Sequence, residues 1–236
     1  MTPPELSHCP GTSAPVDAVS EPSPPPANDI PAKLQNGVDK TGTPASIKLP
    51  QLLETAKEKG ATDAVILAPH QVIVDETLAE KCLSPRCENY GLSRSCPPHV
   101  TGPKDFMAML KNCEAALFFK IDIPKDLLFS SDRRECFRLL HQVASGIESK
   151  AIQWGFKGAS AYAGGSCRNI FCYDEASCRV IDEKSPCRHP HTARPSMSGF
   201  GVHVAKLMET AGWHDDGPSP SPEGMSHVCG LVLLAQ

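Results

Sequence analysis

Four cysteines crowd into one short stretch of this chain and restrict its fold more than any other feature. The stretch reads GGSCRNIFCYDEASCRVIDEKSPC (164–187), and its cysteines are Cys167, Cys172, Cys178 and Cys187. Clustered cysteines in a protein that keeps its thiols reduced are metal ligands more often than disulfides. The stretch therefore predicts a loop that wraps around a metal centre.

The spacing of these cysteines bears on which metal they hold. Structural zinc sites commonly use two tight pairs of ligands, with two to four residues between the members of a pair. Here the gaps are four, five and eight residues, and no pair has a two-residue gap. An iron–sulfur cluster is larger than a zinc ion and accommodates longer gaps. The spacing favours an iron–sulfur cluster of the 4Fe-4S type, with zinc as the alternative.

A second group of cysteines lies in the irregular segment KCLSPRCENYGLSRSCPP (81–98). Its members are Cys82, Cys87 and Cys96. Pro, Gly, Ser and Asn residues predict a loop here, and loops commonly carry binding residues. We expect a second metal centre on these three thiols, against the alternative of three unrelated buried cysteines. Cys113 follows a helical apolar pattern and is predicted to be a core residue, with a role as fourth ligand as the alternative.

Residues that flank the four-cysteine stretch suit an anionic cluster. Gly165, next to Gly164, lets the backbone pass close to a cofactor. After Cys187 the chain is basic, and Arg188 and Arg194 are expected to stabilise the negative charge of a thiolate-bound cluster. A solvated basic loop is the alternative for this run. His189 and His191 are further candidate ligands.

Charge and hydropathy exclude several kinds of partner. The formal net charge is −4 and the isoelectric point is near 6.1, whereas a nucleic-acid-binding domain usually has a basic face. No apolar run approaches the roughly 20 residues of a membrane helix, and the N-terminus lacks the pattern of a secretory signal. We therefore expect a cytoplasmic protein that binds neither nucleic acid nor membrane.

The chain divides into a tail and one domain. Residues 1–45 are rich in Pro, Ser, Ala and Thr and predict a disordered tail, and residues 46–236 predict a single α+β domain. We expect about five strands in a mixed or mainly antiparallel sheet, covered by three to four helices. The expected strands are 64–68, 71–75, 115–123, 158–166 and 227–235. The expected helices are 49–59, 103–113, 131–154 and 198–211.

These motifs together resemble one known family. The quoted features are C-x4-C-x2-YG-x4-CPP, then GGSC, then CRHP-x3-RPSMSGFGVHVAKLM, and a terminal GLVLL strand. They resemble a cysteine-rich family of predicted metal-binding proteins found mainly in anaerobic bacteria and archaea, over about residues 46–236. Many members carry a tighter C-x2-C-x2-C after GGS, so this chain resembles a subgroup. The resemblance implies metal binding and an iron–sulfur role, without a defined reaction.

The sequence thus supports one main functional hypothesis and two alternatives. The main hypothesis is an iron–sulfur protein, with up to two clusters, that takes part in electron transfer with a redox partner protein. A structural zinc protein is the first alternative. A thiol redox or metal-delivery protein is the second, although the chain has no C-x-x-C pair.

Overall fold

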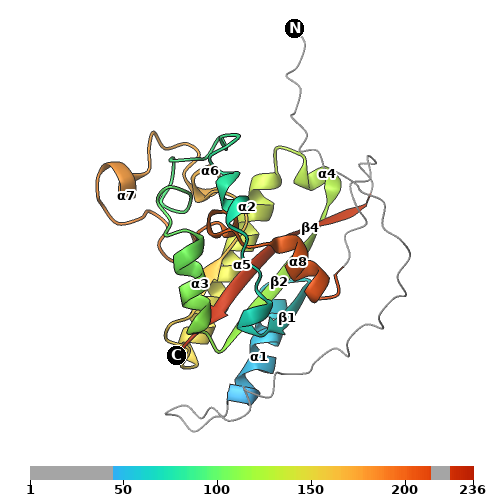
Figure 1. Cartoon of the computed structure of the whole chain (residues 1–236). Coiled ribbons are helices and arrows are strands. Elements are labelled where there is room, and N and C mark those ends of the chain that lie inside the picture. Colours follow the sequence, from blue (N-terminus) through green and yellow to red (C-terminus); the bar gives the residue numbers. More distant parts are fainter. Residues whose placement is uncertain (1–44, 214–223) are drawn as a thin grey trace, which may run out of the picture.

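Four antiparallel strands form the sheet that supports the rest of the domain. The computed structural model describes residues 45–213 and 224–236. Its strands are β1 (Asp63–Leu67), β2 (Ala115–Pro124), β3 (Ser160–Tyr162) and β4 (Met225–Leu234). They lie in the order β1-β2-β4-β3, and each neighbouring pair runs antiparallel. The long pair β2 and β4 crosses the centre of the molecule (Figure 1).

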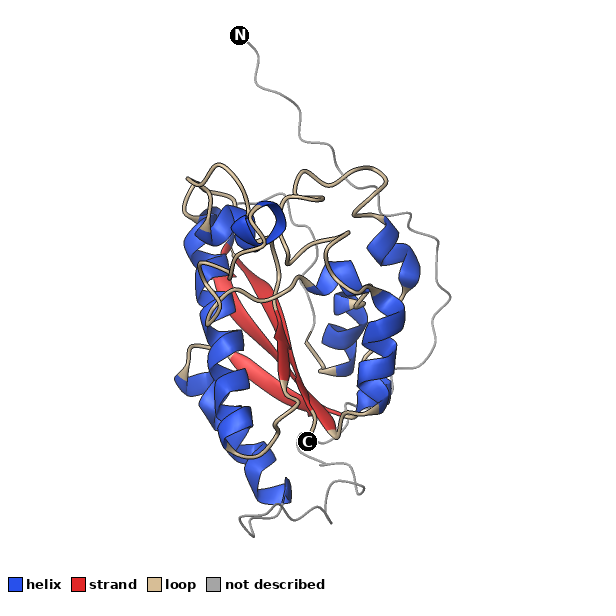
Figure 2. Ribbon diagram, turned by 90° about the vertical axis from the view of Figure 1, so that its left-hand side faces the viewer, coloured by secondary structure: helices blue, strands red, loops and turns tan. Residues whose placement is uncertain are grey.

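Alternate residues of the two central strands enter two separate apolar cores. On β2, Leu117, Phe119 and Ile121 enter one core, whereas Ala116 and Phe118 enter the other. Successive side chains of a strand point to opposite faces, so the sheet is covered on both sides. Figure 2 shows helices on either side of the strands. This explains why β2 reads as a nearly continuous apolar run rather than as a half-polar one.

Eight α-helices occur within the described residues. The first core is covered by α1 (Ala45–Glu58) and α5 (Arg133–Gln153), and the second by α3 (Pro103–Lys111) and α8 (Val204–Thr210). Four shorter helices are α2 (Glu76–Glu80), α4 (Lys125–Leu128), α6 (Cys167–Phe171) and α7 (Arg179–Asp182). None of the described helices has the length and apolar character needed to cross a membrane.

The predicted α+β class is confirmed, but the prediction of a fifth strand at residues 71–75 is wrong. Residues 71–75 do not pair with β1, because the 3-10 helix Pro69–Gln71 turns the chain away from the sheet. The Gln71 side chain accepts a hydrogen bond from the Ala68 amide at 2.8 Å and stabilises that turn. Only an isolated bridge between Val74 and Val202 remains of the expected strand. The sheet is antiparallel throughout.

The boundaries of the other elements follow the prediction closely, with two differences. The expected strand 158–166 is limited to the three residues of β3. The expected helix 198–211 is split into the 3-10 helix Met197–Phe200 and α8, because Gly201 lies between them with a φ of +69°. Residues 1–44 of the predicted tail lie outside the residues that the structure describes.

Candidate functional site

Two cysteine loops lie at the same end of the domain. The first cysteine loop (residues 81–98) follows α2, and the second cysteine loop (residues 164–194) follows β3 and contains α6 and α7. Figure 1 places α2 and α6 near each other above the sheet. Because it contains these two short helices, the second loop is less irregular than its sequence predicts. One face of α6 is anchored, because Ile170 and Phe171 are buried.

Buried serines join the two loops. The Cys167 amide donates a hydrogen bond to Ser95 Oγ at 3.3 Å, and Ser93 Oγ lies 3.4 Å from Ser166 Oγ. The Ser196 amide donates to the Ser95 carbonyl at 3.0 Å. Ser93, Ser95 and Ser166 are all buried. Buried hydroxyl groups that satisfy one another in this way fix the relative position of the two loops.

Burial raises the pKa values of cysteine thiols in both loops. Burial raises the pKa of Cys82, and the neighbouring thiols of Cys87 and Cys96 raise it further. Burial also raises the pKa of Cys167 to about 11, with hydrogen bonds from Ser95 and Ser93 opposing the rise, and with Cys96 and Cys187 adding to it.

Cys172 in the second loop behaves in the same way. Burial raises its pKa, and so do the thiols of Cys187 and Cys178. The two loops approach each other at Cys96 and Cys167, since Ser95 Oγ accepts a hydrogen bond from the Cys167 amide and lies 3.9 Å from Cys96 Sγ.

Arginine side chains hold the outer part of the second loop. Arg188 donates to the Ser177 carbonyl at 3.2 Å and pairs with Glu175 at 3.1 Å. Arg168 donates to the carbonyls of Cys172 and Glu175. Both guanidinium groups lower the pKa of the Cys172 thiol. They therefore favour the thiolate form, which is the form that binds metal.

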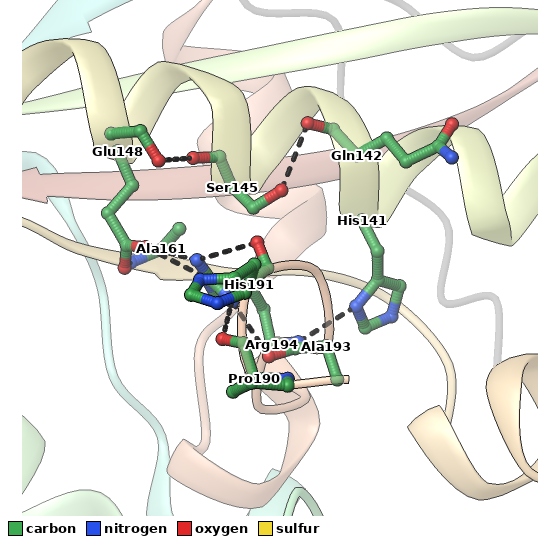
Figure 3. Close-up of polar contacts among 10 residues, drawn as sticks. His141, Gln142, Ser145, Glu148, Ala161, Pro190, His191, Ala193 and Arg194 are labelled. Carbon is green, nitrogen blue, oxygen red and sulfur yellow. Dashed lines mark hydrogen bonds and ion pairs between the residues drawn. The ribbon is translucent and has the colours of Figure 1, made fainter. Parts of the chain in front are cut away.

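His141 on α5 holds the two ends of the second loop together. Its Nδ1 accepts a hydrogen bond from the Arg194 amide at 3.0 Å (Figure 3). Nε2 therefore carries the proton and donates to the Gly164 carbonyl at 3.2 Å. The ring is fully buried, and this burial lowers its pKa to about 4. His141 is thus a neutral residue that positions the loop.

Glu148, two turns further along α5, binds strand β3 and the end of the second loop. Its carboxylate accepts hydrogen bonds from the Ala161 amide at 2.7 Å and from Arg194 Nε at 2.9 Å (Figure 3). The Arg194 guanidinium also donates to the carbonyls of Pro190, His191 and Ala193. Only 11% of the Arg194 side chain and 14% of the Glu148 side chain are exposed. Arg194, expected beside a cluster, thus engages Glu148 and its own loop.

Gly165 sits where the second loop leaves the sheet. Its φ is +80°, and a Cβ there would lie 3.1 Å from Phe137 Cδ1 and 3.3 Å from Ile170 Cδ1. Both the backbone conformation and the crowding favour glycine. The residue brings the chain close to α5 just before Cys167, so its visible role is in packing.

The remaining candidate residues have structural contacts. Cys113 packs beside the second core and its thiol donates to the Met109 carbonyl at 3.2 Å, as expected for a core residue. Cys136 and Cys229 are buried in the two apolar cores. The His189 ring stacks on Phe171 with centroids 5.2 Å apart, and its amide contacts Cys187 Sγ at 3.3 Å. The His191 carbonyl accepts from Arg194.

The donor set fits a soft metal, although its ligands are not drawn together. Within residues 45–213 and 224–236, no three Cys, His, Asp or Glu side chains have the geometry of a metal site. Thiols with raised pKa values are protonated at neutral pH and do not attract one another. Metal binding releases these protons and draws thiolates in. Seven unpaired thiols in two contacting loops, with arginines nearby, suit such a metal.

Sequence reasoning missed the residues that hold the loops rather than the candidate ligands. His141 and Glu148 lie seven residues apart on α5, and so on the same side of the helix. The available signal was that His141, Ser145 and Glu148 form a line of polar residues on one side of a helix whose opposite stripe is apolar. The serine bridge gave no signal, because serine is common in loops.

The fold and the two loops define the class: a cysteine-rich α+β domain with seven of its cysteines in two loops at one end of an antiparallel sheet. Residues 65–234 match the family described as Predicted metal-binding protein (DUF2284). The chain belongs to this family, which confirms the resemblance noted from its motifs. Comparisons with curated proteins and with solved structures gave no match.

Proposed function

We propose that this protein binds iron–sulfur clusters of the 4Fe-4S type and acts in electron transfer or as a redox component. The proposal takes Cys167, Cys172, Cys178 and Cys187 as ligands of one cluster, and Cys82, Cys87 and Cys96 as ligands of a second centre. The observation that carries it is the contact between the two cysteine loops, in which the Cys167 amide donates a hydrogen bond to Ser95 Oγ next to Cys96. Membership of a metal-binding family supports it.

The spacing of the ligands supports iron–sulfur over zinc. A single zinc ion needs four ligands within a radius of roughly 2.3 Å, which tight cysteine pairs supply readily. The cysteines here are widely spaced, and two short helices, α6 and α7, lie between them. Iron–sulfur clusters are larger than a zinc ion and use the same soft thiolate ligands, so they tolerate this wider spacing.

The residues of the chain supply three things to such a centre. Arg168 and Arg188 favour the thiolate form of Cys172. Their positive charges would also compensate the negative charge of a thiolate-bound cluster. The buried serines join the two loops by hydrogen bonds. His141 and Glu148 hold the loop ends. When bound, a cluster with four thiolate ligands supplies one-electron chemistry, and a centre with three leaves one iron accessible to a further ligand.

A redox partner protein is part of the proposal. Leu83 and Leu92 in the first loop and Tyr173 in the second are about half exposed or more. Apolar side chains beside a redox centre favour transient contact with a partner. Reduced thiols of this number suit the cytoplasm, which we propose as the compartment.

The deciding experiment is a count of iron, zinc and acid-labile sulfide in protein purified without oxygen. We expect iron and sulfide in about equal amounts, as in 4Fe-4S clusters, and visible absorbance that bleaches with dithionite. Colourless protein with stoichiometric zinc would overturn the proposal in favour of a structural zinc protein. A metal-free protein whose thiols react readily would favour thiol exchange or metal delivery.

A further inference from the structure

We propose that Cys82 and Cys87 form a reversible disulfide bond when the metal-free protein meets a small disulfide such as oxidised glutathione. The two residues enclose the turn 83–86 of the first cysteine loop. Formation of the bond needs no metal. The proposed function enters only in the consequence, which is that the disulfide makes both thiols unavailable as metal ligands.

The backbone brings these two cysteines together. The Cys87 amide donates a hydrogen bond to the Cys82 carbonyl at 3.1 Å. With standard bond lengths, such a hydrogen bond holds the two Cα atoms within about 7 Å, and hydrogen-bonded residues of antiparallel strands have Cα atoms about 5.5 Å apart. Disulfides join residues whose Cα atoms are about 4.4–6.8 Å apart. The bond can therefore form without a large movement of the backbone.

Contacts on both sides of the turn keep its two ends in place. Just after α2, the Cys82 amide donates to the Ala79 carbonyl at 3.0 Å. On the other side, the Tyr90 amide donates to the Cys87 carbonyl at 3.0 Å, and the Arg86 guanidinium lies over the Tyr90 ring at 5.6 Å. Because the fold already closes the turn, the disulfide pays little further loop-closure entropy.

Cys87 is the more accessible thiol of the two. It is exposed, whereas Cys82 is partly buried and Cys96, the third cysteine of the loop, is buried. The turn residues 83–86 are exposed as well, so a small disulfide can reach Cys87 from solvent. Thiol modification follows exposure. We therefore expect Cys87 to react first and Cys82 to complete the bond.

The reaction consists of two thiol–disulfide exchange steps. The Cys87 thiolate attacks one sulfur atom of glutathione disulfide, which forms a mixed disulfide on Cys87 and releases one glutathione thiolate. The Cys82 thiolate then attacks the Cys87 sulfur and releases the second glutathione. In total the two protein thiols lose two electrons and two protons, and one glutathione disulfide becomes two glutathione thiols. An excess of reduced glutathione reverses both steps.

Peptide mapping of the full-length protein tests the proposal. The reduced, chelator-treated chain is incubated with glutathione disulfide, quenched with acid, alkylated and digested with trypsin. Because trypsin cleaves after Arg86, a Cys82–Cys87 disulfide joins the peptides 82–86 and 87–94. We expect this pair as the main disulfide, and its loss after treatment with dithiothreitol. A main product that joins 82–86 to 95–104, which contains Cys96, would overturn the proposal, as would glutathione that stays on Cys87.

Three variants test the order of the two steps. Cys82→Ser should retain glutathione on Cys87, because the second thiol is missing, whereas Cys87→Ser should leave Cys82 mainly unmodified. Cys113→Ser, the matched control outside both cysteine loops, should form the disulfide as the wild type does. Equal glutathione on the remaining cysteine of the first two variants would overturn the order. The metal count that tests the proposed function is a separate measurement, so either result stands without the other.

Discussion

At the scale of single residues, His141 is the polar side chain on which the second loop depends most. It is fully buried, it uses both ring nitrogens, and its pKa is lowered from 6.5 to about 4. Its contacts require the neutral ring, because Nδ1 must accept a hydrogen bond from Arg194. A buried neutral histidine makes folding stability depend on pH.

The pH dependence has a definite sign. Because the pKa is lower in the folded state, the stabilisation is complete above pH 6.5 and is lost as the pH falls towards 4. The full loss is about 3 kcal/mol. Denaturant unfolding at pH 7, 5.5 and 4.5 should show a steeper decline for the wild type than for His141→Gln, whose amide retains one donor and one acceptor. Equal declines would contradict this account.

The buried pair of Glu148 and Arg194 gives a second prediction at this scale. Glu148→Gln leaves the Arg194 charge in a site that is only 11% exposed, and removing one partner of such a pair costs about 3 kcal/mol. The matched control is Glu54→Gln, whose pair with Lys57 is exposed and should change stability by less than about 0.5 kcal/mol. Urea unfolding measures both. Similar values for the two variants would show that Glu148 does not stabilise the fold.

At the scale of elements, the central strands were predictable and the loops were not. Helix α5 has the apolar period of a helix, whereas β2 and β4 are nearly continuous apolar runs of strand length. The 71–75 segment has the same β-branched composition, yet Pro69 and Gln71 turn it away from β1. The candidate ligands were evident from composition and spacing. Their arrangement depends on contacts between residues about 70 positions apart, such as Ser95 and Cys167, which no local pattern encodes.

The pairing of β2 with β4 contains a close contact that can be tested. Gly230 lies opposite Phe119, and a Cβ at Gly230 would lie 2.3 Å from Phe119 Cζ. Gly230→Ala must displace a fully buried ring and should cost about 1–3 kcal/mol. In Gly146→Ala on α5 the new methyl group meets only the flexible Lys59 side chain, so stability should stay equal or rise.

Thermal unfolding of the two glycine variants measures the difference. Metal content should be unchanged in both, because neither position is in a cysteine loop. A Gly230→Ala variant as stable as the wild type would show that the Phe119 ring can move without cost.

At the scale of the whole molecule, different contacts stabilise the sheet and the cysteine loops. Two apolar cores stabilise the sheet from both sides, whereas the loops at its end have mainly polar contacts. Removing metal should therefore leave the backbone circular dichroism nearly unchanged and loosen the loops.

Limited proteolysis checks this separation. Trypsin should cleave after Arg179 and Lys184 in the second loop at least about tenfold faster after metal removal, because local opening precedes cleavage. Cleavage after Lys150 of α5 serves as the internal control and should stay slow. Equal cleavage of the loop before and after chelation would contradict a metal-stabilised loop.

Because His141 of α5 binds both ends of the second loop, the length of this loop can change during evolution. Gly164 and Arg194 return to the same histidine, so residues can be inserted or deleted between them without shifting the sheet. Doubling the length of a flexible closed loop costs only about 0.6 kcal/mol. Cysteine spacing can therefore diverge among relatives while the scaffold stays constant, and this chain's wide gaps become a variation that the domain tolerates at little energetic cost.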